Sequence, residues 1–224
     1  MNTNVTQTIA EQVTALKASL RAKAPADILS VFDREQEALG DAGVPAGVAA
    51  LGTRMPDGNL LGIHGEATSL ALARKGKAAV VVFYRGAWCP YCNLALHAYQ
   101  DQLVPALAEK GIPLIAVSPQ KPDGSLTMQQ TNNLAFTVLS DPGNQIGVQL
   151  GILSSPRSEA ARAAAEAFGV DVAAGNADGT DAVPMPTVVI VDAAGFIRWI
   201  DVHPDYSTRT EPQQILAAVA STIG

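Results

Sequence analysis

The stretch YRGAWCPYCNLALH, residues 84–97, contains both cysteines of the chain, Cys89 and Cys92. The apolar, β-branched run AVVVF at 79–83 precedes it and predicts a strand buried on both faces. Leucines at helical spacing follow from Leu94 to Leu107, and IPLIAV at 112–117 predicts a second buried strand. Strand, helix and strand at this spacing predict a βαβ unit with a parallel pair of strands.

The two cysteines occupy the strand-to-helix junction of that unit. The free N–H groups and the positive end of the dipole in a first helical turn stabilise a thiolate over a thiol. Pro90 suits the first helical position, where its missing N–H costs nothing. The spacing of three lets one thiol reach the other and close an intramolecular disulfide, so we predict a redox-active dithiol. Exposure and the dipole are both greatest at the start of a helix, which favours Cys89 as the attacking sulfur.

Two other interpretations of the pair compete with redox chemistry. A zinc site needs further ligands, but the chain has no third cysteine, and His97 lies too far along the same helix. A c-type haem site needs a histidine where Asn93 stands. We therefore predict no metal and no cofactor, and two inert core cysteines remain the second interpretation.

The rest of the chain adds further helices and strands around this unit. Apolar stripes predict helices over 5–22 and from Pro25 to Leu39, and a loop rich in Gly and Pro follows from 43 to 65. We predict an N-terminal helical arm over 1–45 and one α/β domain with a mixed sheet over 46–224. We assign no chemistry to the arm, which we expect to pack on its own domain or on a second subunit. The remaining predicted elements are strands at 136–139, 187–191 and 196–202, helices from 122–124 to Asn133, after 141–143 to Leu150 and from Ser155-Pro156 to Phe168, and a last helix capped by Thr210 and Gln213.

Composition excludes several classes of function. The chain has 224 residues, of which 48% are hydrophobic, so it can bury a core without disulfide bonds. A net charge of −6 and the lack of a Lys/Arg cluster argue against a nucleic-acid partner. No apolar run approaches the roughly 20 residues of a membrane span. The first residues lack the basic region and the apolar run that are typical of a signal peptide. We expect a cytoplasmic protein that binds no membrane.

Residues from about 50 to 222 resemble the alkyl hydroperoxide reductase/thiol-specific antioxidant family, the peroxiredoxins and their relatives. The resemblance implies a thioredoxin-like fold and thiol peroxidase chemistry. It is carried by Gly52 with MPD at 55–57, VVVFYRGAWCPYC at 80–92, IPLIAVSPQ at 112–120, LSDPGNQIGVQLGI at 139–152 and PTVVIVDAAGFIRWIDV at 186–202.

The resemblance gives two different registers for the site. In the peroxiredoxin register the attacking Cys of the family falls on Cys92. The family's Thr falls on Cys89, its Pro on Arg85 and its Arg on Pro186, so of these four residues this chain retains only the Cys. In the thioredoxin register Trp88, Cys89, Cys92 and Pro186 are all in place, and Cys89 attacks. That register implies a cis peptide bond before Pro186, which with Thr187 would face the dithiol and the bound substrate. The attacking sulfur therefore stays open between Cys89 and Cys92.

The combined prediction is a thiol-dependent redox enzyme that reduces hydroperoxides through a cycle of Cys89 and Cys92. The resemblance implies a thioredoxin-like protein or glutathione as the reductant. The alternatives are a thiol–disulfide oxidoreductase, and a non-catalytic, redox-sensitive binding protein whose arm suggests a homodimer. Around the dithiol we expect Arg85 to support a thiolate and Trp88, Pro90 and Tyr91 to form the rim. His97 and His203 are expected to be structural, and the residues at the end of the last hairpin, Arg209 included, receive no assigned role.

Overall fold

A computed structural model of the chain describes residues 7–223; Val5, at the start of the first predicted helix, lies outside the described residues. Seven strands form one sheet in the order β2-β1-β5-β4-β3-β6-β7. The strands are β1 (Leu60–Leu61), β2 (Ala67–Thr68), β3 (Ala79–Phe83), β4 (Leu114–Ser118), β5 (Thr137–Ser140), β6 (Thr187–Val191) and β7 (Ile197–Val202).

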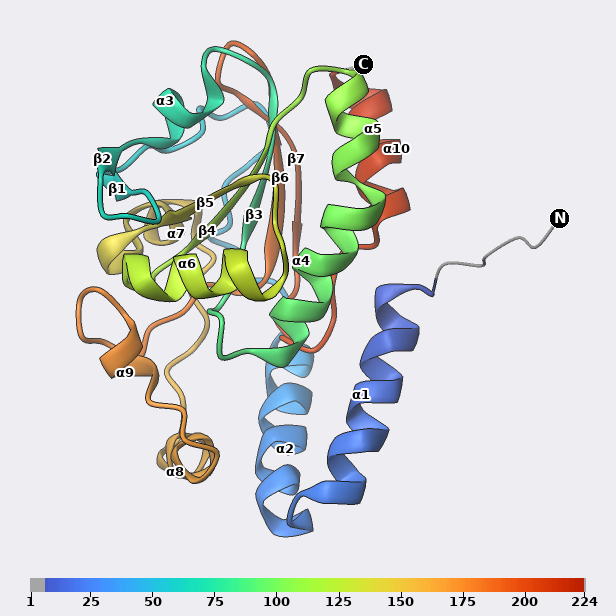
Figure 1. Cartoon of the computed structure of the whole chain (residues 1–224), viewed down its shortest axis with the longest axis vertical. Coiled ribbons are helices and arrows are strands. Elements are labelled where there is room, and N and C mark those ends of the chain that lie inside the picture. Colours follow the sequence, from blue (N-terminus) through green and yellow to red (C-terminus); the bar gives the residue numbers. More distant parts are fainter. Residues whose placement is uncertain (1–6, 224) are drawn as a thin grey trace, which may run out of the picture.

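Helices cover both faces of the sheet and extend beyond one end of it (Figure 1). They are α1 (Ile9–Lys23), α2 (Ala26–Ala42), α3 (Leu70–Arg74), α4 (Pro90–Gln102), α5 (Val104–Glu109), α6 (Pro122–Thr131), α7 (Gln145–Leu150), α8 (Glu159–Ala167), α9 (Val172–Gly175) and α10 (Pro212–Thr222), with a 3-10 turn at Pro142–Asn144.

The centre of the sheet confirms the predicted βαβ unit. Strand β3 pairs parallel with β4, and β4 pairs parallel with β5. Strand β6 pairs antiparallel with both β3 and β7, which confirms the predicted hairpin and the mixed sheet. Every residue of β3 and β4 is buried, because helices cover both of their faces.

Alternate residues of β3 belong to two separate apolar cores. Val80 and Val82 contribute to the core that also contains residues of α4, α5, α6 and α10. Val81 and Phe83 contribute to the opposite core, with residues of α3 and α7. The period-two alternation of a strand therefore fixes α4, and the dithiol at its start, on one defined face of the sheet.

Helices α1 and α2 form a hairpin that extends past the end of the sheet where α4 begins (Figure 1). Helix α1 packs against α4, and α2 packs against α8. Ile9 and Val13 are buried in the same core as α4. The carboxylate of Glu211 accepts hydrogen bonds of 2.9 Å from the backbone N–H groups of both Ile9 and Ala10, so the start of α10 holds the start of α1. The domain boundary at residue 45 stays a prediction.

Two helix starts differ from the sequence-based prediction. Glu211, not Thr210, is the N-cap of α10 and forms a capping box with Gln214, because the Thr210 hydroxyl donates instead to Asp201. Helix α8 starts after Ser158, whose hydroxyl caps it, rather than at Pro156. Within residues 7–223, no helix combines the length and the apolar content that crossing a membrane requires.

Candidate functional site

The dithiol lies in the first turn of α4, as predicted. Cys89 is the N-cap of the helix, Pro90 is its first residue, and Cys92 follows within the same turn. The amide of Asn93 donates to the carbonyl oxygens of Ala87 and Cys89 at 2.7 and 2.9 Å. These bonds fix the loop that delivers the two sulfurs to the helix.

Both cysteines are reduced and buried. The exposed fraction is 1% for Cys89 and 0% for Cys92. The expectation that Cys89 is an exposed sulfur is therefore wrong. It considered α4 alone, whereas the hairpin of α1 and α2 and the segment around Tyr206 cover this end of the helix.

Arg209 provides the charged contact to the dithiol. Its Nη2 lies 3.1 Å from the Sγ atom of Cys92 and 4.0 Å from that of Cys89. Its other terminal nitrogen, Nη1, donates to the backbone carbonyls of Tyr206 and Thr208, which hold the guanidinium in place. Arg209 comes from the loop between β7 and α10, so the end of the hairpin, to which the sequence assigned no role, supplies a cation that contacts the dithiol.

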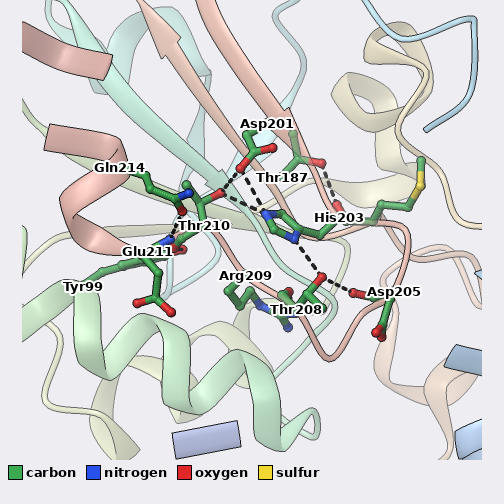
Figure 2. Close-up of polar contacts among 11 residues, drawn as sticks. Tyr99, Thr187, Asp201, His203, Asp205, Thr208, Arg209, Thr210, Glu211 and Gln214 are labelled. Atoms are coloured by element: carbon green, nitrogen blue, oxygen red, sulfur yellow. Dashed lines mark hydrogen bonds and ion pairs between the residues drawn. The ribbon is translucent and has the colours of Figure 1, made fainter. Parts of the chain in front are cut away.

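A hydrogen-bond network centred on His203 orders the loop that carries Arg209 (Figure 2). The Nδ1 atom of His203 lies 2.8 Å from the Thr208 hydroxyl, and Nε2 lies 3.1 Å from the Asp201 carboxylate. The Thr210 hydroxyl also donates to Asp201, at 2.8 Å. His203 thus joins the end of β7 to residues on both sides of Arg209, which gives it the structural role that was expected.

The surroundings of the two sulfurs separate their acidities. Burial raises the pKa of Cys89, and its hydrogen bond to Cys92 raises it further. Burial also opposes ionisation of Cys92. The thiol of Cys89, the charge of Arg209, and the backbone N–H and charge of Arg85 outweigh it and lower the pKa of Cys92 below the ordinary value of 9.0. Both shifts favour a negative charge on Cys92 over one on Cys89.

Arg85 is buried beside the dithiol and close to two aromatic rings. Its guanidinium carbon lies 3.7 Å from the ring centroid of Tyr206 and 5.0 Å from that of Trp88. Its exposed fraction is 5%. Among residues 7–223, its Nε atom has no hydrogen-bond partner, and no carboxylate forms an ion pair with its side chain.

A cavity of about 310 Å³ opens against Cys89. It includes four of the predicted site residues, Arg85, Trp88, Pro90 and Tyr91, but not Cys92. The helical arm and the region of α8 supply the opposite walls. The apolar side chains of those walls are Leu20, Leu29, Phe32, Ala165, Phe168 and Val170.

Cys92 borders a separate and much smaller space of about 10 Å³, together with Pro186, Thr187, His203 and Arg209. This is close to the smallest volume that holds one water molecule. The structure thus places Pro186 and Thr187 beside Cys92, and the Thr187 hydroxyl donates to the carbonyl of Met185 rather than to a sulfur.

The predicted cis peptide bond before Pro186 is wrong, because none of the peptide bonds among residues 7–223 is cis. The backbone around Pro186 continues an extended path. The N–H of Met185 donates to Ile152, and the carbonyl of Pro186 accepts from His203. A trans bond keeps both of these contacts.

Sequence reasoning missed the two tertiary components of the site, Arg209 and the helical arm. Within the described part of the chain, no group of three or more His, Cys, Asp or Glu side chains is placed to hold a metal ion. The one sequence signal for Arg209 was its place in a polar cluster after β7, at 201–209. That cluster did not indicate the direction in which the side chain points.

Comparison with known proteins finds proteins named peroxiredoxins both among sequence relatives and among structures with a similar fold. A Mycobacterium tuberculosis protein (strain H37Rv) that carries peroxiredoxin in its name is 30% identical over 95 residues, which cover 42% of this chain and 59% of that protein. The bcp protein of Haemophilus influenzae, also named a peroxiredoxin, is 29% identical over 103 residues, 46% of this chain and 65% of its own length. The chain therefore matches less than two thirds of the length of these relatives.

Solved peroxiredoxin structures share the fold at low sequence identity. Reduced Prx3 from Vibrio vulnificus superposes with a TM-score of 0.61 at 20% identity, over 77% of this chain and 99% of that one. Peroxidoxin BcpB from Mycobacterium tuberculosis gives 0.57 at 16% identity, over 76% and 96%. The AhpC/TSA family model matches residues 51–200, about two thirds of the chain. Because this match covers more than half of the chain, and the fold is the one that peroxiredoxins share, the chain belongs to the AhpC/TSA family.

Proposed function

We propose that the protein is a thiol peroxidase in which Cys92 attacks the hydroperoxide and Cys89 resolves the product. The contact of 3.1 Å between Arg209 and the Cys92 sulfur carries this proposal. Only a thiolate is an effective nucleophile, and this contact concentrates the negative charge on Cys92. The role of thiolate support that was predicted for Arg85 remains part of the proposal, with Arg209 as the closer cation.

The arrangement supplies two of the three groups that the peroxiredoxin register lacked. Cys89 takes the position of the family's Thr, and its thiol donates to Cys92 in place of a hydroxyl. Arg209 brings a guanidinium to the sulfur from the loop after β7, whereas the family's Arg position holds Pro186. The chemistry of a stabilised thiolate is therefore retained with different residues.

The proposed cycle has two covalent steps. The Cys92 thiolate attacks the terminal oxygen of the hydroperoxide, the O–O bond breaks, and the departing oxygen takes up a proton to leave as an alcohol or as water. Cys92 is thereby oxidised to a sulfenic acid. The Cys89 sulfur then attacks Cys92, water leaves, and a disulfide joins the two residues.

The space beside Cys92 limits the form of the oxidant. At about 10 Å³ it has room for an oxygen atom but not for an organic substituent. Because Cys92 is 0% exposed, a side chain must move to admit even a small peroxide. We therefore expect hydrogen peroxide to react faster than a bulky organic hydroperoxide.

Stopped-flow oxidation of the reduced protein tests the proposal. Hydrogen peroxide is mixed with wild type, Cys89→Ser and Cys92→Ser, and the fluorescence of Trp88 beside the dithiol is followed. We expect wild type to react much faster than free cysteine thiolate, Cys92→Ser to lose the reaction, and Cys89→Ser to stop at a sulfenic acid. The proposal fails if the wild-type rate equals that of a free thiol, or if Cys89 alone is essential.

One observation favours a second candidate function, the reduction of disulfides through Cys89. The larger cavity reaches Cys89 and not Cys92, so a small disulfide in that cavity would meet Cys89 first. The raised pKa of Cys89 opposes this function. In the same experiment, a disulfide that oxidises the protein faster than peroxide, and only when Cys89 is present, would establish it. A cytoplasmic location and a homodimer stay predictions.

A further inference from the structure

The cavity against Cys89 has the size and the lining of a site for a small organic molecule. Its volume of about 310 Å³ lies at the lower end of the range for ligand sites, which are mostly apolar with a few placed polar groups. Leu29 and Phe32 of α2 line it together with Ala165 and Phe168, whose ring lies 6.1 Å from that of Phe32, and these side chains give the site an apolar wall. The proposed attack on peroxide takes place at Cys92, which this cavity does not reach, so the mechanism leaves the cavity without an occupant.

Two cations without carboxylate partners line the same cavity. Arg85 is 5% exposed, its guanidinium lies over the rings of Trp88 and Tyr206, and its Nε atom has no hydrogen-bond partner among residues 7–223. The Nζ atom of Lys17 donates only to the neutral oxygens of Gln36 and Ser207, at 2.8 and 2.9 Å, within the described part of the chain. A buried guanidinium that lies over aromatic rings still offers N–H groups at its edge, the geometry that a carboxylate matches.

We propose that this cavity binds a small thiol that joins an apolar body to a carboxylate, and that this thiol is the reductant of the oxidised enzyme. The inference rests on the proposed function, because it starts from the disulfide between Cys89 and Cys92. The carboxylate pairs with Arg85 and Lys17, the apolar body lies against the wall formed by α2 and α8, and the thiol meets the Cys89 sulfur.

The acidities of the two cysteines give the reaction its direction. The thiolate of the reductant attacks Cys89, the disulfide breaks, and Cys92 leaves as a thiolate beside Arg209. The sulfur with the lower pKa is the better leaving group. A second thiol molecule then attacks the sulfur that the first one contributed to the mixed disulfide. Cys89 is released and takes up a proton, and the two thiol molecules depart as their disulfide. The enzyme gains two electrons, and each thiol loses one.

The position of Cys89 argues against a protein as the reductant. Its exposed fraction is 1%, and the arm walls the cavity that leads to it. The dithiol of a folded partner would have to displace α1 and α2, whereas a small thiol enters without that change.

The experiment starts from the disulfide form, made with diamide so that no peroxidase activity is needed. Reduction by mercaptohexanoate or by mercaptohexanol is followed by acid quenching, alkylation of the freed cysteines and intact-protein mass. Each rate is divided by the rate at which the same thiol reduces a small model disulfide. The two thiols differ in the carboxylate alone. We expect the carboxylate to give a rate at least about tenfold higher in wild type, the effect of one charge-assisted hydrogen bond.

Variants locate the binding site. Leu29→Trp fills the cavity and is expected to slow both thiols, whereas Leu72→Trp, at a side chain that is 68% exposed on α3, is the matched control and should leave both rates unchanged. Arg85→Gln is expected to bring the ratio between the two thiols close to one, and Arg85→Lys to restore most of it. Lys17→Gln, at a half-buried side chain, provides the same measurement if Arg85→Gln does not fold.

Three outcomes would overturn the inference: equal rates for the two thiols in wild type, no effect of Leu29→Trp on reduction, or faster reduction by a thioredoxin than by mercaptohexanoate. If Leu29→Trp slowed oxidation by a bulky hydroperoxide instead, the cavity would hold the organic group of the oxidant. Because peroxide enters only that last measurement, a failure of the reductant site and a failure of the proposed peroxidase function give different results.

Discussion

Replacing Arg209 by methionine tests the electrostatic basis of the site. Methionine keeps an unbranched side chain and removes the guanidinium that lies 3.1 Å from the Cys92 sulfur. A hydrogen bond to a charged group contributes roughly 1.5–3 kcal/mol. Since 1.36 kcal/mol corresponds to one pH unit, the loss should raise the pKa of Cys92 by about one to two pH units.

The ultraviolet absorbance of the thiolate, titrated against pH, measures this change directly. We expect the lower of the two thiol midpoints to move upward in Arg209→Met, and the reaction with hydrogen peroxide at neutral pH to slow in parallel. Arg209→Lys keeps a charge without the planar fork and should lie between the two. Arg198→Met removes an arginine that is paired with Asp192 instead, and is the matched control.

An unmoved midpoint in Arg209→Met, with a circular dichroism spectrum like that of wild type, would refute the reasoning. The charge on Cys92 would then come from the helix terminus and the Cys89 thiol alone. A midpoint that moved equally in Arg198→Met would attribute the effect to net charge rather than to the contact with the sulfur.

Three further predictions concern the surroundings of the site. His203→Asn should loosen the loop that carries Arg209 and raise the pKa of Cys92 by less than Arg209→Met does. The same thiolate titration measures this pKa. A thiol midpoint higher than that of Arg209→Met would contradict a role of His203 through Arg209 alone. Because the pKa of Cys92 is lower in the folded than in the unfolded chain, the unfolded chain binds more protons between those two values. The stability of the reduced wild type relative to Cys92→Ser should therefore increase as pH rises towards about 9, and this advantage should be lost as pH falls through the folded-state pKa of Cys92. Urea unfolding of both proteins at several pH values measures the difference in stability. A difference that does not change with pH would contradict the prediction. Glu211→Ala removes the acceptor that holds the start of α1 and should lower the free energy of unfolding by about 1–3 kcal/mol. Hydrogen exchange should show faster opening of α1 in this variant. Unchanged exchange in α1 would mean that apolar packing alone holds the helix.

The sequence by itself determined the central unit of the fold and the place of the dithiol within it. The β-branched run at 79–83 and the leucines after Leu94 are local periodic patterns, and a strand or a helix is stabilised largely by such patterns. The position of Cys89 and Cys92 in the first turn of α4 follows from the same local signals, with Pro90 as the helix start. The family resemblance then extended this unit to the whole mixed sheet.

Only the tertiary structure decided which sulfur has a guanidinium beside it. The helix terminus acts on both cysteines and, considered alone, favours Cys89. Arg209 lies 117 positions from Cys92 in the chain and reaches it because β7 and the loop after it return to the start of α4. Likewise, the arm became a wall of the cavity because α1 and α2 pack against α4 and α8. Local propensity reports neighbours in sequence, whereas an ion contact or a cavity depends on side chains that only the packed chain brings together.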